Sequence, residues 1–196
     1  EAMWTAFFPA MIKAQTLLND GAIGTVRHLT ANFVSYRDPN TFPNLFNPHL
    51  GGGATLDLGV YPLAIGLLLA GPIEGFSSSV VRGSSGVDEM VGVTATHTSG
   101  VLSQLSFGFR VNLPMAVRVS GDRGALEIPN DFHHPERVVL RRDGKTEVFT
   151  LPPLGVGYAH EVIEVQNCIA SGLTESTVWP LNRSINVAQM VQSIRT

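Results

Sequence analysis

The chain has 196 residues, of which 44% are hydrophobic and only 15% are charged, and its formal net charge is −3. Soluble proteins carry about 25% charged residues, so this composition excludes a disordered chain and predicts an apolar surface that another domain or chain covers. The thirteen Lys and Arg are scattered and form no basic patch, which disfavours nucleic acid and favours a small-molecule ligand.

Cysteine content and apolar runs narrow the class further. Cys168 is the only cysteine, which excludes a disulfide framework and fits a reducing, cytoplasmic compartment. The longest apolar run, Leu58 to Ala70, is shorter than the ~18 to 20 residues that a membrane span requires, so we expect no membrane segment. The chain starts at Glu1 without a signal sequence and is expected to be a piece of a longer protein.

The first predicted elements are a helix, a strand and a long loop. Helical spacing predicts an amphipathic helix that ends at Asn19-Asp20-Gly21. Its buried face is expected to hold Phe7, Phe8, Met11, Ile12 and Leu18. Alternation from Val26 to Val34 predicts a strand, with Leu29, Ala31 and Phe33 on one side. A loop with three prolines then leads to Gly51-Gly52-Gly53.

A buried helix and a series of hairpins follow. Residues Thr55 to Ala70 are apolar almost all round, which predicts a core helix with Thr55 as its cap. Short β-rich runs separated by turn pairs then predict antiparallel hairpins. The paired runs are Val91–His97 with Val101–Phe109, Val117–Ser120 with Ala125–Ile128, and Val138–Arg142 with Thr146–Leu151. Helices over Ala159–Ser171 and Leu181–Ile194 close the chain.

This order of elements predicts an α+β domain with an open, mostly antiparallel sheet and helices on one face. The opposite face of the sheet would then be bare. Along Val101 to Phe109 that face carries semi-polar residues, and the chain is low in charge. We therefore expect the bare face to form a homodimer interface.

The stretch from Gly51 to Pro62 is the richest in chemistry. Asp57 and Tyr61 are four residues apart in it, so they share one face of the predicted helix. In an otherwise apolar helix, a carboxylate and a phenol form either a satisfied structural pair or an acid/base site. Their spacing by itself leaves both alternatives open.

Other motifs are weaker. His160-Glu161 followed by Glu164 lacks the second histidine of a zincin helix, so a solvated helix face is the better interpretation. His133-His134 lacks a spaced third ligand, and we expect no metal site. Gly155-Val156-Gly157 has His160 where a dinucleotide fingerprint has its third glycine, so no Rossmann domain is expected in this chain.

The sequence resembles the Gfo/Idh/MocA oxidoreductases through many spaced matches along residues 1–196. These are Glu1-Ala2-Met3-Trp4-Thr5 with Phe8-Pro9, Gly21 to Gly24, Asn44-Leu45-Phe46, Gly51 to Pro62, Gly121 to Leu126, and Thr174-Glu175-Ser176 leading to Pro180-Leu181. Within the family, the chain is most similar to the branch of dimeric dihydrodiol dehydrogenases and NADP-dependent D-xylose dehydrogenases.

The resemblance implies that residues 1–196 are the substrate-binding and dimerisation domain, with a glyceraldehyde-3-phosphate dehydrogenase-like C-terminal fold. An N-terminal Rossmann domain, absent from this chain, would bind NADP or NAD, and residues 1–20 would be the helix that follows it. The lysine of the family's Glu-Lys-Pro motif would lie upstream of Glu1. The chain by itself is therefore expected to be nearly inert.

The resemblance also implies roles for individual residues. It makes Asp57 and Tyr61 catalytic, because hydride transfer at an alcohol carbon needs a group that exchanges the proton of the oxygen. A phenol, with an ordinary pKa of ~10, needs a nearby cation such as the missing lysine. The residues Trp4, Phe7, Phe33 and Tyr158 are expected to contact the substrate. Ala6 stands where the family commonly has arginine.

The sequence therefore predicts half of an NAD(P)-dependent oxidoreductase that acts on a sugar or small diol, without a metal, a nucleic-acid partner or a membrane. Two alternatives remain open. One is a non-enzymatic module that binds a small molecule or mediates assembly. The other is a redox-neutral use of the same fold, such as glycoside cleavage through transient oxidation.

Overall fold

The strands join into a single eight-stranded sheet with the order β2-β3-β4-β1-β5-β6-β7-β8. The computed structural model describes residues 2–196, so Glu1, the first residue of the predicted domain and of its matched motif, lies outside the described residues. The strands are β1 Val26–Val34, β2 Ile73–Arg82, β3 Asp88–His97, β4 Leu102–Gly108, β5 Val117–Gly121, β6 Gly124–Ile128, β7 Arg137–Arg142 and β8 Lys145–Thr150.

The position of β1 defines the topology. It lies between β4 and β5, parallel to β4 and antiparallel to β5. The remaining neighbours pair antiparallel, which confirms the open, mostly antiparallel sheet and its three predicted hairpins. A doubly wound nucleotide-binding unit needs successive parallel strands. Residues 2–196 contain one parallel pair, and hence no such unit. Strand β2, a mostly exposed edge strand, was not separately predicted.

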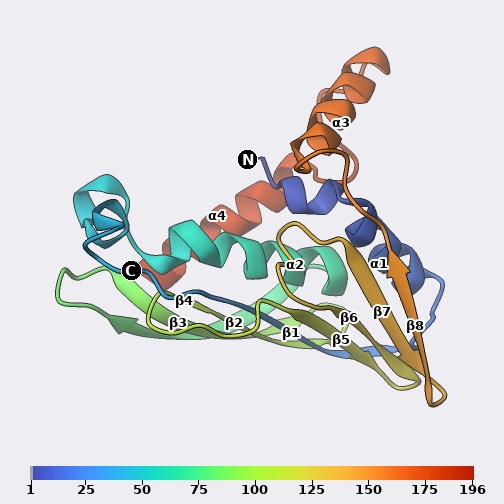
Figure 1. The fold of residues 1–196 in the computed structure, drawn as a ribbon, viewed down its shortest axis with the longest axis horizontal. Helices are drawn as coiled ribbons and strands as arrows, with labels where there is room; N and C mark the ends of the chain where they lie inside the picture. The colour runs from blue at the N-terminus through green and yellow to red at the C-terminus, as the bar shows by residue number, and fades with distance from the viewer. Residues whose placement is uncertain (1) are drawn as a thin grey trace.

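The helices are distributed unequally around the sheet. They are α1 Pro9–Asn19, α2 Val60–Ala70, α3 Tyr158–Ala170 and α4 Leu181–Arg195, with short turns at Trp4–Phe7, Pro43–Phe46, Pro48–Leu50 and Thr55–Gly59. Figure 1 shows α1, α2 and α4 on one side of the sheet, while α3 projects away from the body. The other face of the sheet carries no helix of the described residues, as predicted.

The first helix differs from its prediction. Phe8 is extended and Pro9 begins α1, because proline fits the first helical position and leaves the residue before it outside the helix. This start sets the phase of the helix, and Ala10, Met11, Ala14 and Leu17 face the core. Ile12 is 47% exposed, so its predicted place on the buried face is wrong.

Helix α2 forms the centre of the core. It packs against β1, β4 and α4, and all its residues from Pro62 onward are buried. With the turns before it, Pro48–Ala70 is a 23-residue helical stretch, longer than the predicted apolar run, and the mean hydropathy of its most apolar 18 residues is 1.6. It is long and apolar enough to cross a membrane, but 78% of its most apolar part is buried inside the protein. In this fold it is a core helix.

A buried histidine joins the end of α2 to the sheet. His97 Nδ1 lies 2.8 Å from the carbonyl oxygen of Gly71, and Nε2 lies 3.0 Å from the hydroxyl of Ser103. A carbonyl only accepts, so Nδ1 carries the proton and Nε2 accepts from Ser103. Burial lowers the pKa of His97, and the Gly71 carbonyl opposes this effect in part. The neutral imidazole is therefore the form that fits the fold.

We expect His97 to make the protein less stable in mild acid. The unfolded chain binds a proton on this imidazole below about pH 6.5, whereas the native state, with its lowered pKa, does not. The free energy of unfolding should therefore fall from about pH 7 to about pH 5, and His97→Gln should flatten that slope. Urea unfolding at several pH values measures this. His49→Gln, at an exposed histidine, is the matched control, and an unchanged slope in His97→Gln would contradict the prediction.

Candidate active site

A buried carboxylate defines where the predicted catalytic stretch begins. Asp88 on β3 is 1% exposed, and its Oδ2 accepts from the backbone N–H and from the hydroxyl of Thr55, each at 2.6 Å. The prediction that the Thr55 side chain caps the helix is wrong, because Thr55 is the donor and the acceptor comes from a distant strand. A carboxylate at this end also interacts favourably with the helix dipole.

Two glycines allow the backbone to come this close. Gly53 has a φ of +118°, and a Cβ on it would lie 2.2 Å from the Asp88 carboxylate. A Cβ on Gly59 would lie 2.7 Å from the ring of Phe107 on β4. Between them, Thr55–Gly59 winds as a π-helix before α2 begins, in place of the continuous α-helix predicted. Such wide turns occur frequently at functional sites.

Asp57 lies in this π turn. Surrounding protein removes part of its solvent, which raises the pKa of Asp57, and the positive charge of Arg37 opposes that effect. The side chain remains exposed, so water limits the shift. No sequence pattern marks Arg37 as a site residue. Its guanidinium donates to Ser35 Oγ at 3.0 Å and lies over the Phe42 ring at 5.5 Å.

Tyr61, the second residue of α2, lies in a cluster of rings. Its ring centroid lies 5.4 Å from that of Phe33 on β1 and 5.7 Å from that of His133, in the loop after β6. Phe33 and His133 stack on each other at 4.6 Å. Three segments that are far apart in the sequence therefore meet at the predicted acid/base residue.

His133, which the sequence marks only as part of a histidine pair, lies beside Tyr61. Its pKa is lowered to about 4, first by burial, then by His134 and also by Arg37, while Asp131 acts in the opposite direction. The imidazole is therefore neutral near pH 7. Its Nδ1 is buried and makes no hydrogen bond to the described residues. Spacing could not have placed it here, because only the packing of the loop onto β1 and α2 brings His133 to Tyr61.

The four predicted substrate-binding residues fall in two places. Trp4 stacks on Tyr158, with ring centroids 4.5 Å apart, and its ring lies 6.4 Å from that of His133. Trp4, Tyr158 and Phe33 therefore lie in or beside the ring cluster around Tyr61. Phe7 instead lines an apolar cavity of about 540 Å³ against α3 and the loop after it. The substrate-binding roles of all four stay predictions.

Charged and metal-ligating groups surround the same cluster. Ala6, where the resemblance places arginine, is fully buried, whereas Arg37 acts on both Asp57 and His133. Asp131, His133 and His134 each offer a ligand atom within 4.8 Å of one another. The expectation of no metal site rested on the histidine pair and overlooked the nearby Asp131.

Comparison with known proteins identifies relatives. Residues 11–127 match the family model described as the GFO/IDH/MocA C-terminal domain. The trans-1,2-dihydrobenzene-1,2-diol dehydrogenases of Homo sapiens and Mus musculus are 30% and 31% identical over 205 residues. Both alignments cover 100% of this chain and 60% of the relative, so the chain spans about three fifths of the length of these curated proteins.

Solved structures share the fold. A 3-ketoreductase from Actinomadura kijaniata in complex with NADP and TDP-benzene is 25% identical, with a TM-score of 0.85 over 100% of this chain and 61% of that chain. An aldose-aldose oxidoreductase from Caulobacter crescentus complexed with glycerol has a TM-score of 0.83 at 22% identity. It covers 97% of this chain and 58% of that chain, and supports the fold alone.

We expect Asp88→Ala to lower the free energy of unfolding by about 2 to 4 kcal/mol, because it leaves two buried donors of Thr55 without their acceptor. Denaturant unfolding measures this cost. Asp20→Ala removes an exposed carboxylate and should change stability by no more than about 0.5 kcal/mol. Equal effects of the two substitutions would show that Asp88 does not hold the helix start.

Proposed function

We propose, from the premise that this chain belongs to the GFO/IDH/MocA family of oxidoreductases, that it is the substrate-binding and catalytic half of an NAD(P)-dependent enzyme acting on a sugar or small diol. The observation that carries the proposal is the position of Tyr61, between Phe33 and a neutral His133. Because the chain spans three fifths of its curated relatives, the activity proposed is that of a longer protein.

A nicotinamide cofactor supplies hydride acceptance and donation when bound. Residues 2–196 contain neither the glycine fingerprint nor the parallel strands that hold a dinucleotide, so they do not by themselves fit this group. The relatives support its use, since the Actinomadura ketoreductase was solved with NADP. We assign cofactor binding to another domain of the longer protein.

The chain's own residues bind the substrate and move its proton. The rings of Trp4, Phe33 and Tyr158 offer apolar faces to the carbon skeleton of a sugar or diol. As the phenolate, which a cation such as the lysine of the proposed nucleotide-binding domain would stabilise, Tyr61 takes the proton of the substrate hydroxyl during oxidation. As the phenol, it returns that proton during reduction.

Asp57 cannot lower the pKa of Tyr61, since it is an anion when charged. Partial burial raises the pKa of Asp57 and Arg37 opposes that effect. The Asp57 carboxylate accepts a hydrogen bond from a substrate hydroxyl and so orients the substrate.

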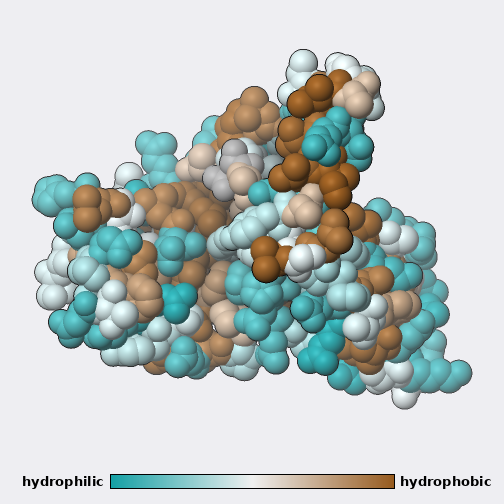
Figure 2. All heavy atoms as spheres, turned by 45° about the horizontal axis from the view of Figure 1, so that its top comes forward, coloured by the Kyte–Doolittle hydropathy of each residue, from teal (hydrophilic) through white to brown (hydrophobic). Residues whose placement is uncertain are grey.

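An exposed apolar surface supports a second domain. On α3 and its flanking loops Val156 is 76% exposed and Ile169 is 71% exposed. Val162, Ile163, Val165, Leu154 and Leu173 are exposed on the same elements. Figure 2 shows hydrophobic side chains gathered over the projecting helix. Surfaces of this kind mark interaction sites, and we propose that the nucleotide-binding domain covers this one.

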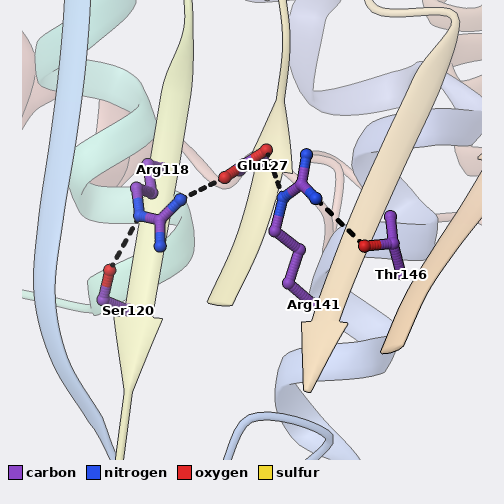
Figure 3. A network of polar contacts seen from close by, with 5 residues as sticks. All are labelled: Arg118, Ser120, Glu127, Arg141 and Thr146. Atoms are coloured by element: carbon purple, nitrogen blue, oxygen red, sulfur yellow. Dashed lines mark hydrogen bonds and ion pairs between the residues drawn. The ribbon is translucent and has the colours of Figure 1, made fainter. Parts of the chain in front are cut away.

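The bare face of the sheet supports a homodimer. Short uncharged side chains such as Thr30, Ser77 and Ser106 line a shallow hollow of about 500 Å³ across β1 to β4. Farther along, Glu127 on β6 accepts from both Arg118 and Arg141, as Figure 3 shows. These three charged side chains are therefore linked in one network of two arginines and one glutamate. We further propose that the protein is cytoplasmic, as its single cysteine suggests.

In the full-length protein, Tyr61→Phe should lower turnover by about 100-fold or more, because it removes the group that exchanges the substrate proton. Steady-state rates with aldoses and diols, followed by NAD(P)H absorbance, measure this. Tyr36→Phe deletes a hydroxyl from an exposed tyrosine and should leave the rate unchanged. A near-normal rate in Tyr61→Phe would refute the assignment.

Intact mass, cofactor binding and the NAD(P)H assay separate the alternatives. We expect the native gene product to exceed 21.0 kDa by about one nucleotide-binding domain when its intact mass is measured. A full-length protein that binds no nicotinamide cofactor would favour the non-enzymatic module. Product formed without net change in NAD(P)H would favour the redox-neutral use of the fold.

A charge in the centre of the bare face should dissociate the dimer. Thr94 on β3 is exposed there, and burying an arginine against a second copy is unfavourable. Sedimentation velocity at micromolar concentration should therefore show a dimer for the parent protein and a monomer for Thr94→Arg. Gln192→Arg places the same charge on an exposed position of α4 and should remain dimeric. A monomeric parent protein would rule out this interface.

A further inference from the structure

Three metal-ligating side chains converge in the loop between β6 and β7. The carboxylate of Asp131 and one imidazole nitrogen each of His133 and His134 lie within 4.8 Å of one another. All three residues are half-buried. They come from four consecutive residues, so local backbone geometry must turn side chains that would ordinarily diverge toward a common point.

The backbone of this loop is held in the required shape. Asn130 and Asp131 have φ values of +51° and +46°, in the left-handed region that non-glycine residues seldom occupy. The N–H of His134 donates to the carbonyl of Asp131 at 2.9 Å and closes the turn. The Thr5 hydroxyl donates to the His133 carbonyl at 2.6 Å. Strained conformations persist where the surroundings enforce them, and they cluster at functional sites.

Phe132 anchors the loop from within. Its side chain is fully buried and packs against Phe33, at 5.7 Å between ring centroids. The residues on either side of it therefore stay at the surface of the ring cluster. The two imidazoles also contact each other, with centroids 4.2 Å apart. The buried Phe132 thus holds the backbone of the loop in place.

We propose that Asp131, His133 and His134 bind a first-row transition-metal dication such as Zn²⁺. Two imidazoles and one carboxylate are ligands suited to such ions. Metal–ligand bonds of about 2.0 to 2.2 Å place neighbouring ligand atoms about 3.0 to 3.5 Å apart. Each ligand atom would therefore move by roughly 1 Å to coordinate the ion. His133 Nδ1, buried without a hydrogen-bond partner among the described residues, gains one in the complex if it is the ligating nitrogen.

The site would be open, with moderate affinity. Three protein ligands leave at least one coordination position for water or for an oxygen of a bound small molecule. The His133 ring lies 5.7 Å from Tyr61, so the ion would stand at the rim of the aromatic cluster. Asp131 contributes the one negative charge, and Arg37 acts on His133 with a positive charge that disfavours a cation. We therefore expect micromolar binding.

Titration of the untagged, metal-free full-length protein with Zn²⁺ tests the proposal by calorimetry. Co²⁺ replaces Zn²⁺ in a parallel experiment, where d–d absorption reports the ligand set. We expect one equivalent that is weakened at least about tenfold in His134→Ala and in Asp131→Asn. His49→Ala, at an exposed histidine outside the loop, should bind as the parent protein does.

The folding of the two variants is checked separately from their metal binding. Asn tolerates the left-handed backbone of Asp131, so Asp131→Asn removes the charge without straining the turn. Circular dichroism and thermal unfolding in metal-free buffer establish that each variant is folded. Absence of binding in the parent protein would overturn the proposal. So would a bound equivalent that survives both substitutions in folded protein, or one that His49→Ala removes.

Discussion

The contact between Asp88 and Thr55 is the constraint on which the arrangement of the domain depends. A carboxylate that is almost fully buried must be hydrogen-bonded, and the donors it uses belong to the first turn of the central helical stretch. This pairing holds the stretch to β3, and Gly53 and Gly59 permit the close approach it demands. The positions of Asp57 and Tyr61 follow, since both lie within two turns of the anchored residue.

Three surfaces of the described residues stand out. One lies around Tyr61, where aromatic packing excludes water and keeps His133 neutral while Arg37 supplies a positive charge. The second is the outer face of the sheet, with short polar side chains and a network of two arginines around one glutamate. The third is the apolar face of α3. Two large uncovered surfaces account for a chain that is unusually poor in charged residues.

The loop between β6 and β7 links the candidate site to the interior. Phe132 inserts among the core side chains, so His133 and His134 are presented at the edge of the ring cluster by a rigid support. Thr5 fixes the same loop from the N-terminal turn that carries Trp4. A displacement of this loop would therefore alter the packing of Trp4, Phe33 and Tyr61 together.

The sequence by itself determined most of the helices and strands, the three hairpins and the inward face of β1, because periodicity and turn residues act over a few neighbours. It also identified Asp57 and Tyr61 as candidates. Only the tertiary structure decided that β1 separates β4 from β5, that Asp88 anchors Thr55, and that His133 and Arg37 adjoin Tyr61 or Asp57. These depend on contacts between distant segments, whose partners no local pattern encodes. The phase of α1, which exposes Ile12, likewise followed from where Pro9 started the helix.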